Sequence, residues 1–267
     1  MKPAPFAYRK ARSLDEAVAL LADNADARLL AGGQSLIATL NMRLSAPSLL
    51  IDVNGLAGLD HIDAKGGALT VGALTRHAQA GRSDVIAKHA PLIAKALPHI
   101  AHPAIRNRGT IGGSIAFADP AAELPACLLA LGGEVETHGP NGKRIIKADD
   151  FFVDLYETAL RPGEMLTAIR VPAATPETRT GFAELARRHG DYAIVGLAAT
   201  ARAKGKGLAD VRLAFFGVGN TALRARKAEA ALDLAPHDDI QATASEKKHL
   251  AGVLLRRVAT QLMEPRA

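Results

Sequence analysis

Two short segments in which Gly-Gly is followed within two residues by Ser constrain this chain most. They are LLAGGQSLI at residues 29–37 and RGTIGGSIA at residues 108–116. Glycine lets the backbone turn tightly and brings its N–H groups close to a ligand, and a helix N-terminus that follows favours an anion. The pattern suits a phosphate cradle, and it also suits two tight structural turns. Two such loops in one chain predict a ligand with two phosphates.

The single cysteine limits the redox chemistry that this chain can perform by itself. Cys127 has no partner for an internal disulfide, and one thiolate supplies neither a Cys-based zinc site nor an iron–sulfur cluster, which needs about four ligands. If electrons from such a cluster pass through this protein, the cluster lies on another chain. The length of 267 residues allows about two domains.

Charge and apolar pattern bear on partners and location. The chain has 33 basic and 27 acidic residues, a net charge of +6, and the basic residues are dispersed among acidic ones. Its aromatic residues are seven Phe and three Tyr, whereas base stacking needs aromatics along a basic groove, so we expect no nucleic-acid binding. No run approaches the roughly 18 apolar residues of a membrane span, and the N-terminal prolines do not suit a signal peptide. We therefore expect a cytoplasmic protein.

Periodicity and capping residues predict an α+β chain. Ser13 with Glu16 has the form of a capping box, and Ser35 is expected to cap a helix after the first Gly-Gly. Asp119 and Pro120 form a suitable N-cap and first-turn pair. The predicted strands are 6–11, 29–30, 49–53, 69–72, 114–118, 134–138, 143–147, 165–171, 181–187, 193–203 and 208–217. The predicted helices are 14–21, 36–44, 121–131, 223–232 and 245–262, with further helical segments broken by Pro91, Pro98 and Pro103.

The order of these elements predicts two domains. Residues 1–175 form the first, with a boundary in the turn-rich stretch near Leu59 and subdomains of about 1–58 and 59–175. A linker rich in Pro, Thr and Ala leads into residues 176–267, where an antiparallel three-stranded meander precedes two helices. Strands followed by helices indicate a separate, smaller α+β domain.

Four segments resemble one protein family. They are LLAGGQSL followed by an apolar helix and LLIDV; HPAIRNRGTIGGSIAFADPAAELPA; RRHGDYAIVGLA; and FFGVGNTALRA. In this order they are similar to the FAD-binding medium subunit of molybdenum hydroxylases, the family of the carbon monoxide dehydrogenase medium subunit and the flavin domain of xanthine dehydrogenase. The resemblance runs from about Phe6 to the last helix. It implies a two-subdomain FAD-binding domain of the PCMH type, followed by the smaller domain.

The resemblance also implies which residues contact FAD. The backbone of the two Gly-Gly segments would wrap the pyrophosphate, and Glu123 falls where the family places a carboxylate near the sugar or adenine side of the cofactor. Ile100 and Leu166 match apolar positions against the cofactor rings, and Tyr192 matches an aromatic residue near the isoalloxazine. No residue of this chain is expected to act as a general base. The complete expected set is Leu30, Ala31, Gly32, Gly33, Gln34, Ser35, Leu36, Ile100, Gly109, Thr110, Ile111, Gly112, Gly113, Asp119, Glu123, Leu166 and Tyr192.

Two positions depart from the pattern of the family. The family frequently has His where this chain has Phe117, and Lys where it has Arg28. Neither change removes the expected phosphate cradle. Both leave open the surroundings of the flavin ring and the adenine contacts.

Three further patterns have both a functional and a structural interpretation. Residues 217–222, GVGNTA, have the GxGxxA form of a dinucleotide-binding loop, but too few residues follow for the remaining βαβ units, which favours a structural turn. His99 and His102 have helical spacing, but prolines flank them and no carboxylate or Cys completes a set, so we expect no metal site. Cys127 lies among leucines and is predicted to be a small core residue.

Three functions follow as hypotheses. The first, implied by the resemblance, is an FAD-binding electron-transfer subunit of a heteromeric molybdenum hydroxylase. A large subunit would hold molybdopterin, a small subunit two [2Fe-2S] clusters, and electrons would pass through FAD to an external acceptor, in a dimer of heterotrimers. The second is a stand-alone flavin-dependent or nicotinamide-dependent reductase, for which the sequence offers no convincing proton-donating set. The third is a non-catalytic module that binds nucleotides or nucleic acid.

Overall fold

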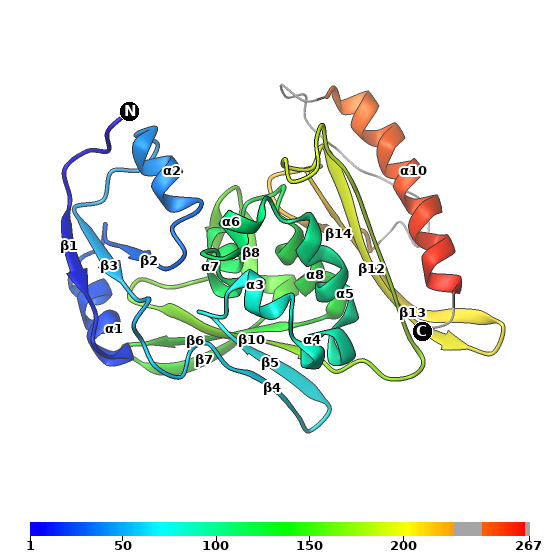
Figure 1. Cartoon of the computed structure of the whole chain (residues 1–267), viewed down its shortest axis with the longest axis horizontal. Helices are drawn as coiled ribbons and strands as arrows, with labels where there is room; N and C mark the ends of the chain where they lie inside the picture. Colours follow the sequence, from blue (N-terminus) through cyan, green and yellow to red (C-terminus); the bar gives the residue numbers. More distant parts are fainter. Residues whose placement is uncertain (227–241, 265–267) are drawn as a thin grey trace.

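The structure, a computed structural model, describes residues 1–226 and 242–264. Three parts follow one another along the longest axis of the molecule (Figure 1). A small parallel sheet forms the N-terminal end, a five-stranded sheet covered by helices forms the middle, and a second antiparallel sheet with a long helix forms the other end. None of the helices in these described ranges is long and apolar enough to cross a membrane.

The N-terminal part is a three-stranded parallel sheet with strand order β1-β3-β2. Ser13 begins the first helix as expected, because its hydroxyl oxygen accepts a hydrogen bond from the Glu16 N–H at 3.1 Å. The helices connect consecutive strands, and the middle strand β3 is the most buried. The elements are β1 (Ala7–Lys10), α1 (Leu14–Asp23), β2 (Arg28–Leu30), α2 (Leu36–Asn41) and β3 (Leu49–Asp52).

The expectation that Ser35 caps α2 is wrong. Its backbone is already helical, with φ −98° and ψ −49°, and its side chain makes no capping hydrogen bond. A capping residue normally has an extended backbone, which aims its oxygen at the N–H groups of the first turn. Helical bonding begins instead with the Ile37 N–H, which donates to the Gly33 carbonyl at 3.0 Å. The helix ends at Asn41, before the predicted end at Leu44.

The middle part is an antiparallel sheet with strand order β4-β5-β10-β6-β7. The predicted hairpin and the predicted strand 165–171 are confirmed as β6, β7 and β10. The strands are β4 (Ile62–Lys65), β5 (Ala68–Gly72), β6 (Glu134–Gly139), β7 (Gly142–Lys147) and β10 (Met165–Pro172), with a separate pair β8 (Phe152–Asp154) and β9 (Glu157–Thr158). The helices are α3 (His77–Ala80), α4 (Asp84–His89), α5 (Pro91–Ala96), the short 3-10 helix η1 (Leu97–His99), α6 (Pro103–Arg106), α7 (Ile111–Phe117), α8 (Glu123–Leu131) and α9 (Ala148–Phe151).

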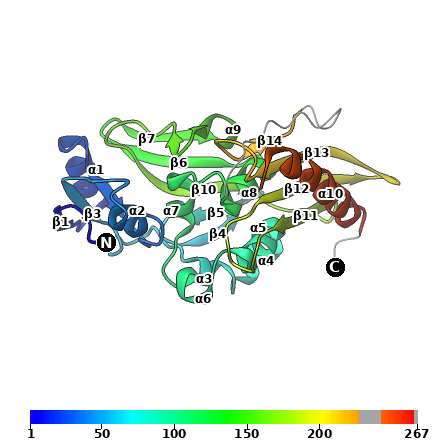
Figure 2. The ribbon, with the colours of Figure 1, turned by 90° about the horizontal axis from the view of Figure 1, so that it is seen from above.

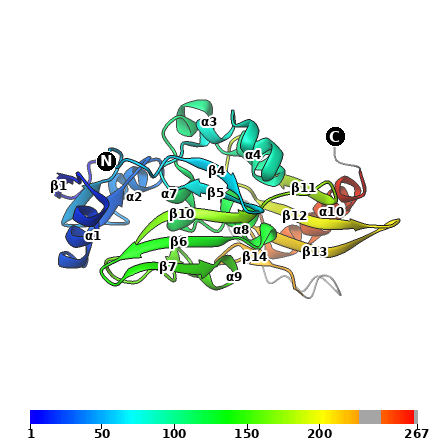
Figure 3. The same cartoon turned by 90° about the horizontal axis from the view of Figure 1, so that it is seen from below.

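The last part is a four-stranded antiparallel sheet covered on both faces (Figures 2 and 3). Helices α5 and α8 of the middle part pack on one face, and α10 packs on the other. Thr243 and Glu246 form a capping box at the start of α10, and its inward face carries Ala251, Leu254, Val258 and Leu262. The elements are β11 (Thr178–Leu185), β12 (Val195–Lys204), β13 (Gly207–Phe216), β14 (Leu223–Arg224) and α10 (Ala244–Met263).

Helix α8 is the centre of the molecule. All its residues from Glu123 to Ala130 are buried, because the helix lies between the middle sheet and the last sheet. Cys127, in this helix, is fully buried, as its place among leucines predicts. The same apolar core continues into the last part through Phe182 and Phe216. The two parts therefore share one core.

Residues 114–118 are not the predicted strand but belong to helix α7. Thr110 is its N-cap, and the Thr110 hydroxyl oxygen accepts a hydrogen bond from the Gly113 N–H at 3.1 Å. Ile111 and Ile115, four residues apart, are both fully buried, which is the spacing of one helix face. Tertiary packing thus overrides the β preference of these isoleucines.

Asp119 does not cap α8, which begins two residues later than predicted, at Glu123, with Ala122 at the N-cap. Ala118 has a left-handed backbone, φ 53°, and ends α7. The chain then turns, and the Asp119 carboxylate accepts a hydrogen bond from the Ala121 N–H at 2.9 Å. Asp119 therefore stabilises the turn between the two helices.

Two expectations for the last part are wrong. The sheet has a fourth strand, because Leu223 and Arg224, predicted as the start of a helix, pair with β13 as β14. The rest of the predicted helix 223–232 lies mostly outside the described residues. The GxGxxA segment is a turn between antiparallel strands, as expected. Its Gly217 N–H donates to the Pro120 carbonyl at 2.8 Å, and Asn220 donates to Asp154 at 2.8 Å.

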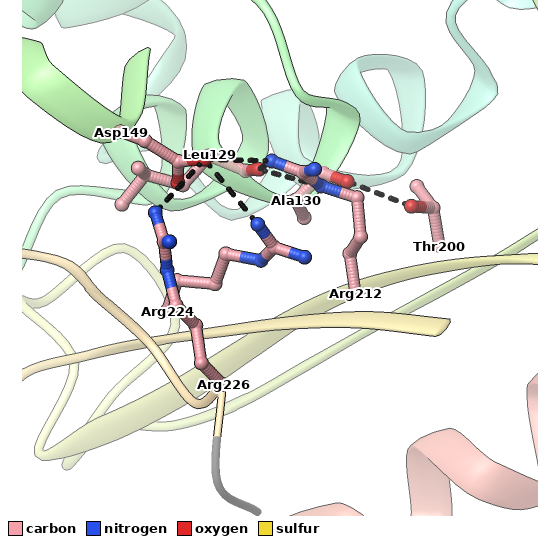
Figure 4. A network of polar contacts seen from close by, with 7 residues as sticks. All are labelled: Leu129, Ala130, Asp149, Thr200, Arg212, Arg224 and Arg226. Carbon is pink, nitrogen blue, oxygen red and sulfur yellow. Dashed lines mark hydrogen bonds and ion pairs between the residues drawn. The ribbon is translucent and has the colours of Figure 1, made fainter. Parts of the chain in front are cut away.

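A polar network ties the last sheet to the C-terminal end of α8 (Figure 4). Arg212 donates through Nη2 to the Leu129 carbonyl at 3.0 Å, and Thr200 donates to the Ala130 carbonyl at 2.7 Å. These carbonyls belong to the last turn, where a helix lacks its regular donors; the Leu129 carbonyl also accepts from the Gly132 N–H at 3.1 Å. The carboxylate of Asp149 faces three guanidinium groups, those of Arg212, Arg224 and Arg226, at 3.5, 3.3 and 3.1 Å.

Replacement of Arg212 by methionine tests this network. The variant keeps an apolar stem but removes both donors to Leu129, so we expect the free energy of unfolding to fall by roughly 1–3 kcal/mol. Arg202→Met is the matched control, because Arg202 forms an exposed ion pair with Asp210, and such pairs contribute about 1 kcal/mol or less. Urea unfolding of the full chain measures both changes. Equal losses of unfolding free energy in the two variants would contradict the conclusion that Arg212 stabilises the contact between the last sheet and α8.

Candidate functional site

The first glycine loop offers a row of backbone donors. It joins the end of β2 to the start of α2, and Gly33 has φ +73°, a conformation that glycine adopts readily. No group in the described part of the chain accepts a hydrogen bond from the N–H groups of residues 32–35. The Gln34 side chain folds back and donates to the Gly32 carbonyl at 3.0 Å. These free N–H groups at a helix start suit an anionic ligand.

The two glycine loops touch each other. A Cβ atom on Gly32 would lie 2.4 Å from the Arg108 carbonyl oxygen and 2.8 Å from the Gly109 Cα. These distances are shorter than any side chain tolerates, so only glycine allows the contact. Two motifs separated by more than 70 residues therefore lie side by side, which is the arrangement that a shared ligand requires.

The second loop contributes mainly close packing, because most of its N–H groups already have acceptors within the protein. The N–H groups of Ile111 and Gly112 donate to the Thr75 and Ala73 carbonyls, both at 2.9 Å, and the Gly113 N–H donates to the Thr110 hydroxyl. A Cβ on Gly112 would lie 2.5 Å from the Ala73 Cβ. These glycines let α7 pack directly on the turn that follows β5. Most unoccupied donors of the joint site thus lie on the first loop, and the Thr110 N–H of the second loop adds one more within the described residues.

A buried histidine holds the second loop in place through two hydrogen bonds. His77 donates through Nε2 to the Thr110 carbonyl at 2.9 Å, and its backbone N–H donates to the Gly109 carbonyl at 3.0 Å. Burial lowers the pKa of His77 to about 4, so the ring is neutral at pH 7.

Two residues that the sequence reasoning missed connect the loops through their side chains. Asn54 donates through Nδ2 to the Ala31 carbonyl at 2.8 Å, and Arg76 donates to Asn54 Oδ1 at 2.7 Å and to the Arg108 carbonyl. A signal for Asn54 exists in the sequence, because it follows the buried strand β3 at its carboxyl end, where ligand sites of parallel sheets gather. Arg76 has no such signal.

A second polar group lies at the other end of α7, which is about 10 Å long at 1.5 Å per residue. Asp119 is buried there, and the hydroxyls of Tyr156 and Tyr192 lie close enough to lower its pKa in part. Burial raises the pKa of Asp119, and burial together with Asp119 raises the pKa of Tyr192 to about 12. The predicted residues Asp119 and Tyr192 are thus brought together, and Tyr156 is an addition that sequence reasoning missed.

Glu123 is a buried carboxyl group next to this cluster. It is 8% exposed, and burial raises its pKa to about 7. Glu184 and His99 are close enough to influence that pKa in opposite directions. They face each other, with His99 Nδ1 at 3.2 Å from Glu184 Oε1. Glu184 was not predicted, although the alternation of Phe182 and Glu184 along a strand is a sequence signal for a shared inward face.

The predicted residues Ile100, Leu166 and Leu30 are apolar and lie in the core or next to the first loop. Ile100 and Leu166 are both buried in the central core. Leu30 contacts the first loop, because its Cδ1 would lie 3.2 Å from a Cβ on Gly33. Of the two departures, Arg28 donates to the Ala27 carbonyl at 3.0 Å, and the Phe117 ring packs edge-on against Tyr156 at 5.2 Å. Phe117 thus belongs to the Asp119 end of α7.

The geometry fits a ligand with phosphates. The free N–H groups of the first loop, the glycine contact that a Cβ would block, and two guanidinium groups at the loop junction all favour an anion there. The buried acids Asp119 and Glu123 and two exposed phenols lie at the far end of α7, and they can accept hydrogen bonds from hydroxyl or N–H groups of a ligand. An extended molecule with phosphates in one place and hydrogen-bond donors in another matches both ends.

Known protein families match most of the chain. The family described as "FAD binding domain in molybdopterin dehydrogenase" matches residues 4–174, and the family described as "CO dehydrogenase flavoprotein C-terminal domain" matches residues 180–233. The chain is 43% identical over 243 residues to the 6-hydroxypseudooxynicotine dehydrogenase complex subunit alpha of Paenarthrobacter nicotinovorans. The aligned region covers 89% of this chain and 82% of that protein.

The carbon monoxide dehydrogenase of Hydrogenophaga pseudoflava is similar in sequence and in structure. Its medium chain is 36% identical, and the match covers 96% of each chain. The structure of that enzyme lacking the Mo-pyranopterin moiety of the molybdenum cofactor matches with a TM-score of 0.95 over 98% of each chain. The chain therefore belongs to the family of FAD-binding medium subunits of molybdenum-containing dehydrogenases, which includes the medium chains of carbon monoxide dehydrogenase and the FAD-binding subunits of xanthine dehydrogenase.

Proposed function

We propose that this medium subunit transfers electrons within its complex. It takes electrons from iron–sulfur clusters on a small partner subunit, which receive them from a molybdopterin centre on a large partner subunit, and it passes them to an external acceptor. The observation that carries the proposal is the two-loop site with free backbone donors, in a chain whose one cysteine is buried and cannot hold a cluster.

Residues 32–35 would hold the pyrophosphate of FAD through their N–H groups, with Arg76 and Arg108 adding positive charge. Glu123 and the Asp119 cluster would receive hydrogen bonds from the opposite side, and Ile100 and Leu166 would supply apolar contacts. When bound, FAD supplies the ability to exchange electrons both one and two at a time. The residues of this chain orient the cofactor, neutralise its phosphates and exclude water. None of them has to remove a proton from a substrate.

The partners are proposed on the same grounds. Relatives described as medium chains and complex subunits indicate that this chain works with other subunits. We propose a dimer of heterotrimers, in which each medium subunit faces one iron–sulfur subunit.

Purification of the complex from its native host tests the function. We expect the chain to copurify with two other subunits, and the preparation to show a flavin absorption band and to release about one FAD per medium subunit on denaturation. We also expect the flavin to bleach when the substrate of the complex is added. A complex without FAD, or a flavin that stays oxidised while the iron–sulfur clusters are reduced, would contradict the proposal.

A further inference from the structure

A chain of side-chain hydrogen bonds runs from the first glycine loop to the second. Asn54 donates through Nδ2 to the Ala31 carbonyl at 2.8 Å and to the Leu30 carbonyl at 3.2 Å. Its Oδ1 accepts a hydrogen bond from Arg76 Nη2 at 2.7 Å. The other terminal nitrogen of Arg76, Nη1, donates to the Arg108 carbonyl. We call these two side chains, Asn54 and Arg76, the loop latch.

The Asn54 end of the latch is fixed by a carboxylate. Asp52 Oδ1 accepts hydrogen bonds from both the backbone N–H and the Nδ2 of Asn54, each at 2.8 Å, and Asp52 Oδ2 accepts one from the Tyr8 hydroxyl at 2.6 Å. Burial alone would raise the pKa of Asp52, but the hydrogen bonds from Tyr8 and Asn54 outweigh it and lower the pKa. The carboxylate therefore stays ionised at neutral pH and keeps Asn54 in one orientation.

The Arg76 end is fixed by backbone. Arg76 forms an isolated antiparallel bridge with Thr110, and the N–H of the next residue, His77, donates to the Gly109 carbonyl at 3.0 Å. Arg76, at the start of α3, is thus held beside the second loop, and its side chain reaches Asn54, which contacts the first loop. The same Arg108 carbonyl that accepts from Arg76 is the atom that a Cβ on Gly32 would strike. The latch therefore surrounds the contact between the loops.

We propose that Asn54 and Arg76 are positioning residues for the cofactor. By holding the two loops together, they keep the free N–H groups of residues 32–35 next to the second loop and α7. The N–H groups are then correctly placed for the phosphates of the cofactor. This inference rests on the proposed function of the chain as an FAD subunit. A planar guanidinium is required, because its two terminal nitrogens reach Asn54 and Arg108 at once, which an ammonium group cannot do in the same geometry.

The main alternative is that Arg76 acts only through its charge. Arg76 and Arg108 lie together at the junction, close enough that Arg108 lowers the pKa of Arg76 in addition to the effect of burial. Two positive charges at this place would attract a pyrophosphate without any latch. Substitutions separate the two roles, because Arg76→Lys keeps the charge and loses the fork, whereas Asn54→Ala breaks the latch and leaves every charge in place.

The experiment measures FAD affinity of the complex, purified with its partner subunits and freed of cofactor. We expect Arg76→Lys and Asn54→Ala each to weaken FAD binding roughly tenfold or more, with the same salt dependence as the wild type. The double variant should be no weaker than the weaker single variant, because both changes break one connection. The thermal midpoint of the cofactor-free complex should fall only slightly, because the hydrogen bonds lost are exposed to water. Arg82→Lys, at an exposed arginine outside the latch, is the control and should bind FAD as the wild type does.

Two results would overturn the latch. One is wild-type affinity in Asn54→Ala. The other is full affinity in Arg76→Lys together with a loss in Arg76→Met, which would show that charge alone matters. A wild-type complex that binds no FAD would instead overturn the proposed function, so the two failures are distinguishable.

Discussion

Replacement of Gly32 by alanine is expected to strip FAD from the complex. The new Cβ would lie 2.4 Å from the Arg108 carbonyl oxygen and 2.8 Å from the Gly109 Cα, and both are backbone atoms that cannot rotate away. The loops must separate, which moves the N–H groups of residues 32–35 away from the phosphates. A forced shift of this kind costs about 1–3 kcal/mol, and a loss of that size corresponds to roughly a hundredfold weaker binding at its upper end.

The measurement is the amount of FAD per medium subunit after gel filtration, together with the affinity for added FAD. Gly252→Ala is the matched control, because a Cβ at this helical position of α10 meets no atom within 4 Å. That variant should keep its FAD and gain stability, since alanine favours a helix by about 1 kcal/mol over glycine. Full FAD content in the Gly32→Ala complex would show that the two loops do not act together.

Replacement of Glu123 by glutamine is expected to stabilise the cofactor-free chain at alkaline pH while weakening FAD binding. In the folded chain the pKa of Glu123 is raised to about 7, mainly by burial, from 4.5. Below pH 4.5 the carboxyl is protonated in both states and its burial carries no charge penalty. Between pH 4.5 and 7 the unfolded chain ionises and the folded chain does not, so the free energy of unfolding falls as pH rises. Above pH 7 the penalty is constant, at ~3 kcal/mol.

Glutamine has nearly the same shape and does not ionise, so the variant avoids this penalty. We expect equal stability of variant and wild type near pH 4 and a growing advantage of the variant up to about pH 8. Urea unfolding across this pH range measures the difference, and Glu157→Gln, at an exposed residue of β9, is the control. A constant difference at all pH values would show that Glu123 does not hold a proton in the folded chain. A loss of FAD affinity in the Glu123→Gln variant would show why the chain retains a buried acid that lowers its free energy of unfolding.

Patterns that depend on neighbouring residues were predictable from the sequence. The cap at Ser13, the hairpin of β6 and β7, and the long helix α10 each follow from a local signal that the tertiary structure does not oppose. The meeting of the two glycine loops was also foreseeable, because two similar loops with Gly at the contact predict a shared ligand.

The errors arise where distant residues decide the local conformation. Residues 114–118 look like a strand by composition. However, the N–H groups of Ile111 and Gly112 donate to the Thr75 and Ala73 carbonyls, and these bonds fix the first turn of α7 as a helix. Leu223 and Arg224 look helical, yet β13 offers an open edge that they complete. Asn54 has a sequence signal in its place after the buried strand β3, but its hydrogen bonds with Arg76 could not be assigned from sequence, because they form only when two loops come together in space.

The core shared by the middle and last parts has a consequence for how the chain is made. Synthesis proceeds from the N-terminus at about 5–20 residues per second, and the helix α8 is complete long before Phe182, Thr200, Arg212 and Phe216 leave the ribosome. During that interval one face of α8 has no sheet to cover it, and its last carbonyls lack the side-chain donors of Thr200 and Arg212. The nascent FAD-binding segment therefore exposes apolar surface and is prone to aggregation until the final sheet has been synthesised. A chaperone that shields apolar helices would raise the yield of the native subunit.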